Sequence, residues 1–167
     1  MSSTIKNFNL FVDGKGYAGS VEEFTPPALA LKLEDFRAGG MDGMTSVDMG
    51  MEKMEASFVM SEFNKDILNN FGLIEGGKIP LTLRAAQQNE QDGSVTPIVY
   101  KMRGKIVKKD GGTFKAGEKS QLSVTVDLDY YKLEHGGETL HEIDVINTIR
   151  IVNGHDQLAS IRSAIGL

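Results

Sequence analysis

The sequence predicts an antiparallel β domain that carries two short helices. Three observations support this prediction: one segment in which apolar and polar residues alternate strictly, several further apolar segments separated by glycine-containing turns, and only two stretches with helical spacing. The chain has 167 residues, of which 40% are hydrophobic and 25% are charged, as expected of a globular protein. We therefore expect one domain that covers residues 1–167.

The clearest strand is expected between Gln121 and Tyr130. Because successive side chains of a strand point to opposite faces, strict alternation indicates one buried face and one solvated face. The apolar positions are Leu122, Val124, Val126, Leu128 and Tyr130, and the polar positions include Asp127 and Asp129.

Two strands at 79–87 and 97–108 precede this one, and the three should form an antiparallel meander. The turns contain Asp92-Gly93 and Asp110-Gly111-Gly112. Glycine adopts the positive φ that such turns require. Five further strands are expected at 7–12, 17–24, 29–34, 54–60 and 139–145.

One helix is expected where Phe63, Ile67 and Phe71 recur at four-residue spacing. Its candidate caps are Ser61 or Asn64 at the start and Gly72 at the end.

The second helix is expected at the C-terminal end, where Leu158, Ile161 and Ile165 form an apolar stripe. Its candidate caps are Asn153 or Asp156 at the start and Gly166 at the end.

Residues 35–51 follow neither the helical nor the strand period, and we interpret them as a long loop. Such loops are uncommon in compact domains and are usually functional or disordered. A disordered linker would be poor in apolar residues, yet this segment contains Met41, Met44, Val47 and Met49. We expect a neighbouring copy of the chain to order the loop. A loop folded over its own core is the alternative.

Composition excludes several classes of protein. The net charge of −5 argues against a protein that grips nucleic acid, because phosphate binding requires clustered lysine and arginine. The absence of cysteine excludes disulfides and thiolate sites. Residues 1–9 lack the pattern of a secretory signal, and no apolar run is long enough to anchor the chain in a membrane. We expect assembly in the cytoplasm.

Catalytic, metal and cofactor sites are not expected. The histidines His135, His141 and His155 lie near turns and strand ends, without the spacing of metal ligands. No serine lies in a Gly-x-Ser-x-Gly motif.

A basic stripe formed by Lys101, Arg103 and Lys105 shares one strand face. A nucleic-acid site would interleave aromatic residues for stacking, and none lies on that face. Asp127 and Asp129 lie on the polar face of the following strand, so we favour charge pairing within or between subunits over DNA binding.

Ordered segments along the whole chain carry a family resemblance. The strongest segments are 130–134, 142–147, 152–158 and 165–167 near the C-terminus, and 33–34, 37–42 and 47–50 in the first third. Minor matches are Phe71-Gly72-Leu73, Met102-Arg103-Gly104 and Lys115-Ala116-Gly117-Glu118. Together these segments resemble the major tail tube proteins of contractile-tailed bacteriophages and of R-type pyocins.

The resemblance implies a fold of two packed antiparallel sheets, as a sandwich or distorted barrel, with a short internal helix and a C-terminal helix. It implies a structural protein of a virion tail or pyocin-like particle that forms homo-hexameric rings stacked into a tube. The implied partners are a contractile sheath protein, baseplate and tail terminator proteins. The lumen would pass a tape measure protein or DNA without specific binding.

On this hypothesis the expected subunit interface is the 35–51 segment, and Asp127 and Asp129 are expected to face the lumen. The interface residues are Arg37, Gly39, Gly40, Met41, Met44, Val47 and Met49. Two alternatives remain at this point: a ring protein of the type VI secretion kind, and a monomeric β-barrel that binds a small ligand.

Overall fold

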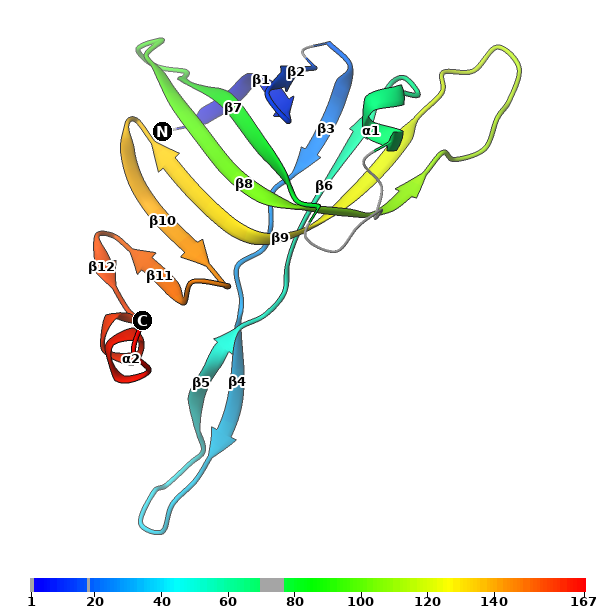
Figure 1. Cartoon of the computed structure of the whole chain (residues 1–167). Helices are drawn as coiled ribbons and strands as arrows, with labels where there is room; N and C mark the ends of the chain where they lie inside the picture. Colours follow the sequence, from blue (N-terminus) through cyan, green and yellow to red (C-terminus); the bar gives the residue numbers. More distant parts are fainter. Residues whose placement is uncertain (1, 18, 70–76) are drawn as a thin grey trace.

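A computed structural model of the chain describes residues 2–17, 19–69 and 77–167. Its centre is a meander of three long antiparallel strands, as the sequence predicts (Figure 1). These strands are β7 (Ile79–Asn89), β8 (Val95–Asp110) and β9 (Leu122–His135). The predicted turn at 91–94 joins the first two, and Gly93 there has a φ of +73°.

The sheet extends on both sides of this meander. On one side β7 pairs with β1 (Ser3–Val12), which pairs with the short β2 (Lys15–Gly16). On the other side lie β10 (Glu138–Asp144), β11 (Ile149–Val152) and β12 (His155–Asp156).

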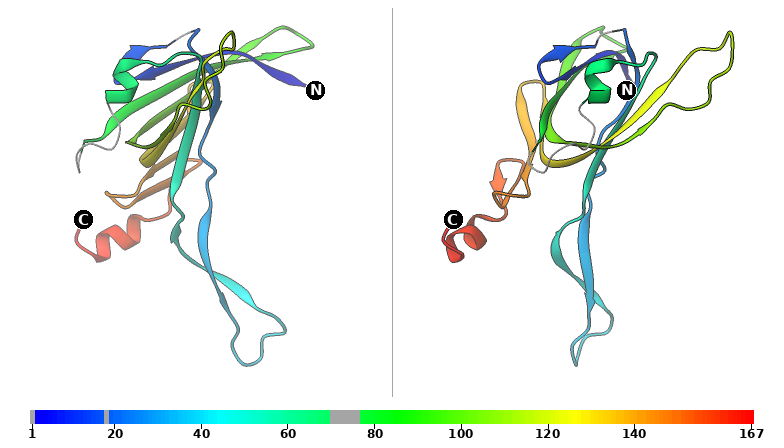
Figure 2. Two further views of the ribbon diagram at one scale, coloured as in Figure 1. Left: turned by 90° about the vertical axis from the view of Figure 1, so that its right-hand side faces the viewer. Right: turned by 45° about the vertical axis from the view of Figure 1, so that its right-hand side comes forward.

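β9 is the strand at which the sheet branches. Residues 122–128 pair with β6 (Met54–Met60), whereas residues 130–135 pair with β10. β6 in turn pairs with β3 (Val21–Thr25). The long strands curve, so that β3 and β6 face β1 and β7 across the core (Figure 2).

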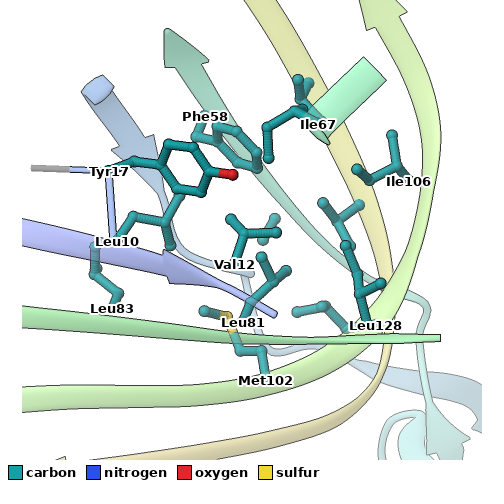
Figure 3. Close-up of a cluster of buried hydrophobic side chains, with 14 of the residues drawn as sticks. Leu10, Val12, Tyr17, Phe58, Ile67, Leu81, Leu83, Met102, Ile106 and Leu128 are labelled. Carbon is teal, nitrogen blue, oxygen red and sulfur yellow. The ribbon is translucent and has the colours of Figure 1, made fainter. Parts of the chain in front are cut away.

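The core fills the space inside this curved sheet, and Figure 3 shows its side chains converging from several strands. Successive residues of β6 and of the first half of β9 alternate between buried and less buried positions, as a half-buried strand requires. The fully buried side chains include Leu10, Met54, Phe58, Leu81, Ile106, Val124 and Val126.

A β-bulge interrupts the predicted alternation in β9. Arg103 pairs with Tyr130 and Gly104 with Leu128, so Asp129 is the extra residue. The bulge shifts the register, and Tyr131 is buried where the sequence pattern placed Tyr130. The prediction for Tyr130 is therefore wrong, because periodicity assumes an unbroken strand.

Both predicted helices are present and short. α1 (Lys65–Asn69) buries Ile67, and the side chain of Asn64 accepts hydrogen bonds from the Asp66 and Ile67 backbone. Asn64 is thus the cap of the two candidates. The expected contributions of Phe71 and Gly72 lie outside the described residues.

α2 (Ala159–Ala164) ends before Gly166, which has a φ of +83°. None of its residues is buried, so the predicted apolar stripe is left exposed by the described part of the chain. Asp156 accepts a hydrogen bond from Leu158 N just ahead of the helix.

Residues 31–51 form a separate two-stranded sheet. β4 (Leu31–Phe36) and β5 (Thr45–Met51) pair with each other and extend away from the large sheet (Figure 1). The prediction of a long loop without strand structure is therefore wrong, since only residues 37–44 connect the strands. Neither face of this hairpin is covered by the described part of the chain, so the hairpin lacks the alternation of a half-buried strand.

The fold class is confirmed as mainly β, with two antiparallel sheets and two short helices. The larger sheet curves but does not close into a barrel within the part of the chain that the structure describes.

Candidate subunit interface

The β4–β5 hairpin is the most exposed apolar element of the described chain. Leu33, Phe36, Met44 and Met49 are each more than half exposed, and Val47 is 44% exposed. A two-stranded hairpin alone is marginally stable in water. Large exposed apolar patches mark interaction surfaces. The hairpin is therefore the strongest candidate for a contact with another chain.

The predicted interface residues fall on two parts of the hairpin. Met44, Val47 and Met49 lie exposed at the start of β5 and along it. Met41 is less exposed, because the connection 37–44 folds around it: Met41 N donates to Ala38 O, and Ala38 N donates to the Met41 sulfur. The other predicted interface residues in this connection are Arg37, Gly39 and Gly40, all exposed.

An ion pair fixes the base of the hairpin to the large sheet. Arg150 Nη2 of β11 lies 2.5 Å from Asp48 Oδ2 of β5. The Arg150 side chain is only 10% exposed. Asp48 Oδ1 also accepts a hydrogen bond from Gly50 N at 2.8 Å. These contacts, that from Arg150 foremost, hold the pKa of Asp48 below its usual value.

Sequence reasoning missed Arg150. It lies between Ile149 and Ile151, both of which are more exposed than the arginine. A buried guanidinium needs a counter-charge. Its partner, Asp48, lies 102 positions away in the sequence, so no local pattern indicates the pair. An isolated arginine in an apolar strand was the only available signal.

An apolar hollow of about 390 Å³ lies beside this ion pair. It separates the hairpin base from the C-terminal helix, and its lining includes Met49, Met51, Ile143, Leu158 and Ile161. Ile161 of α2 and Ile165, directly after its end, continue the apolar surface. Arg162 holds the helix in place by an ion pair to Asp156 and a hydrogen bond to Thr148 O.

Asp127 and Asp129 lie on the polar face of β9, and both are paired with basic groups. Lys53 Nζ is 3.0 Å from Asp127 Oδ2. Asp129 forms ion pairs with Lys78 and with Arg103, the latter at 3.2 Å from Nε to Oδ1. Each aspartate side chain is less than a quarter exposed.

The basic stripe is matched by carboxylates of the same chain. Lys101 Nζ is 3.6 Å from Glu134 Oε1, and Lys132 Nζ approaches the same oxygen at 3.4 Å. Lys105 lies opposite Asp127 in the strand register. Arg103 also lies over the Tyr130 ring, at 5.6 Å from its centroid. Charge pairing of this stripe is thus observed within one chain.

The described ranges contain neither a candidate metal site nor a helix that could cross a membrane. No group of three histidine, cysteine or acidic residues there could hold a metal ion. Among the same residues, no helix has the length and apolar character needed to cross a membrane. His135 lies in β9, His141 in β10 and His155 in β12, and His135 Nε2 lies 3.4 Å from Gln87 Oε1.

The comparisons with known proteins agree with this picture. Residues 2–166 match the family model described as phage tail tube protein FII. The chain belongs to this family of phage tail tube proteins. It is 31% identical over 170 residues to the tail tube protein of Escherichia phage P2, covering 100% of this chain and 99% of that protein. It is 30% identical over 166 residues to the major tail tube protein of Serratia phage KSP20, covering 98% and 95%.

Solved structures support the same fold at low sequence identity. A chain of the sheath–tube complex of the extracellular contractile injection system PVC has a TM-score of 0.61 and 11% identity, covering 78% of this chain and 90% of that one. A chain of the anti-feeding prophage cap has a TM-score of 0.59 and 12% identity, covering 76% and 87%.

This tail tube protein is therefore a structural component of the phage tail, and its place is in the virion. A role as a tube subunit has to account for the exposed hairpin and for the polar face of β9, whose charged groups form ion pairs.

Proposed function

We propose that this tail tube protein forms the inner tube of a contractile tail by stacking homo-hexameric rings. The projecting β4–β5 hairpin is the observation that carries the proposal. Its apolar side chains are left exposed by the residues that the structure describes, and a neighbouring copy would bury them. The fold likeness to a chain of a sheath–tube complex supports the same assembly.

Ring closure would also cover the free edges of the large sheet. Within the described residues, β3 pairs only with β6, and the first half of β1 pairs only with β7. Unpaired strand edges favour association with other strands. A ring that joins such edges gives a wide barrel, since barrel diameter grows with strand number.

The polar face that carries Asp127 and Asp129 suits a lumen wall. Its basic groups are paired with carboxylates, so the face offers few unpaired lysines to a phosphate backbone. Duplex DNA carries one charge per about 1.7 Å, and repeated lysine contacts would retain it. A tape measure protein or DNA would pass such a wall without specific binding.

The proposed partners are a contractile sheath around the tube, a baseplate at one end and a terminator at the other. Solved structures with this fold come from a sheath–tube complex, a tube terminator and a baseplate. We propose no enzymatic activity and no cofactor, since the family and the two relatives are named as tail tube proteins.

The test is assembly of a hairpin variant. Replacing Met41, Met44 and Met49 with serine should abolish rods in negative-stain micrographs while the subunit keeps its circular dichroism spectrum. The matched control replaces the same methionines with leucine, which preserves the apolar surface and should preserve rods. Rods of normal length from the serine variant would show that the hairpin is not an interface.

A further inference from the structure

A second projection lies at the end of the molecule opposite the hairpin. The connection between β8 and β9 extends beyond the sheet (Figures 1 and 2), and we call residues 108–119, which include the paired end of β8, the arm. In every view the hairpin and the arm point away from each other.

The arm is basic and carries an exposed aromatic ring. The arm contains four lysines and two carboxylates, a formal charge of +2, which becomes +1 when Glu22, the partner of Lys119, is counted. Phe114 is 76% exposed although it stacks edge-on against Phe63, with ring centroids 5.4 Å apart. Lys119 forms an ion pair with Glu22 of β3. The charged residues are Lys108, Lys109, Lys115, Lys119, Asp110 and Glu118.

These contacts position the arm on the body of the subunit. The Phe63–Phe114 pair holds it next to α1, and the Lys119–Glu22 pair holds it next to β3. The arm therefore presents a defined surface rather than a free chain.

The distal half of the hairpin has the opposite chemistry. Residues 34–44 contain three carboxylates and one arginine, a formal charge of −2. Phe36 and Met44 in this half are 52% and 66% exposed. The charged residues are Glu34, Asp35, Asp42 and Arg37.

We propose that the hairpin of one copy docks on the arm of a second copy, and that this contact joins successive rings. Opposite charges bring the two surfaces together, and Met44 contributes a thioether to the Phe114–Phe63 pair, a favourable contact for methionine. Two unlike surfaces at opposite ends of one subunit form a head-to-tail contact that propagates. The inference rests on the proposed function and names the surface that receives the hairpin.

Like-with-like pairing is the competing geometry, and electrostatics disfavours it. Two arms would place lysines against lysines, and two hairpin ends would place carboxylates against carboxylates. Only the arm-to-hairpin contact pairs unlike charges.

Cross-linking tests the geometry directly, because the chain has no native cysteine. In rods of the double variant Met44→Cys/Lys115→Cys, a short bismaleimide should give a ladder of covalent multimers on a denaturing gel. Each single variant should remain monomeric. Rods without a ladder would overturn the proposal, as would strong dimers of Met44→Cys alone. Absence of rods from the parent protein would instead defeat the proposed function on which this inference rests.

Charge reversal tests the chemistry. Asp42→Lys and Lys115→Glu should each raise the critical concentration for rod formation about threefold to tenfold, whereas the combined variant should return to within about twofold of the parent. Glu138→Lys, at the exposed first residue of β10, is the control and should change nothing. If the combined variant is no better than the two single variants, the two surfaces do not meet.

Discussion

Gly104 lies where two strands approach too closely for a side chain to fit. It lies opposite Leu128 beside the bulge at Asp129. A Cβ atom at this position would lie 1.9 Å from Asp127 O, a backbone atom that cannot move alone. Glycine is required there because two strand backbones approach closely.

We predict that Gly104→Ala lowers the free energy of unfolding by at least about 2 kcal/mol, since the long strands must separate to admit the methyl group. Urea denaturation followed by circular dichroism measures this change. Gly43→Ala is the control, because its added Cβ meets nothing within 4 Å and its φ is not positive. Equal stability of the two variants would contradict the role of Gly104.

Asp48 is the residue that links the hairpin to the large sheet. Because Arg150 lowers its pKa in the folded protein, the stabilisation is present above the unfolded pKa of about 3.9 and is lost as the pH falls through the lower folded pKa. Hydrogen exchange of residues 31–51 should therefore accelerate below about pH 4, after correction for intrinsic rates.

Asp48→Asn should remove this pH dependence and accelerate exchange at neutral pH. Asp156→Asn is the matched control: it breaks the similar pair with Arg162 and should affect only α2. Hairpin exchange in Asp48→Asn that still changes at low pH would point to another group.

At the scale of elements, periodicity predicts the buried strands well and the exposed ones poorly. The strand predicted at 54–60 coincides with β6, because its alternation records burial against the core. β5 was missed, since glycines and two exposed faces leave no burial pattern. β11 was missed because its central residue is a buried arginine whose partner is remote in sequence.

The candidate site follows the same rule. The methionines of 35–51 indicate an unusual segment from sequence, but their display on a projecting hairpin depends on the pairing of β4 with β5. The pairing of Asp129 with Lys78 depends on the bulge and the curved sheet, which no local pattern encodes.

We predict that the stability of the large sheet does not depend on the distal part of the hairpin. Replacing residues 34–46 with a short glycine–serine turn should change the melting temperature by less than about 3 °C, because among the described strands β4 and β5 pair only with each other. The same variant should form no rods. A fall of more than about 8 °C would assign the hairpin to the folding core instead.

At the scale of the whole molecule, the net charge of −5 accompanies a polar face whose basic groups are paired. The negative net charge and the pairing of the basic groups are both compatible with a tube through which DNA passes without being bound. The exposed apolar surface, in contrast, is concentrated on elements that project from the sheet.

We predict that Asp127→Asn/Asp129→Asn tubes retain short duplex DNA at low salt, whereas parent tubes do not. The double variant leaves Lys53, Lys78 and Arg103 without these carboxylates. Retention should fall as salt rises, as expected for phosphate contacts. DNA that sediments equally with parent and variant tubes would show that this face does not line the lumen.

The most direct test of the account is the structure of the assembled tube by electron cryo-microscopy. We predict stacked sixfold rings in which the hairpin of each subunit contacts a copy in the next ring, with Asp127 and Asp129 on the channel wall. A tube in which the hairpin contacts no other copy, or a protein that stays monomeric at every concentration, would contradict the account.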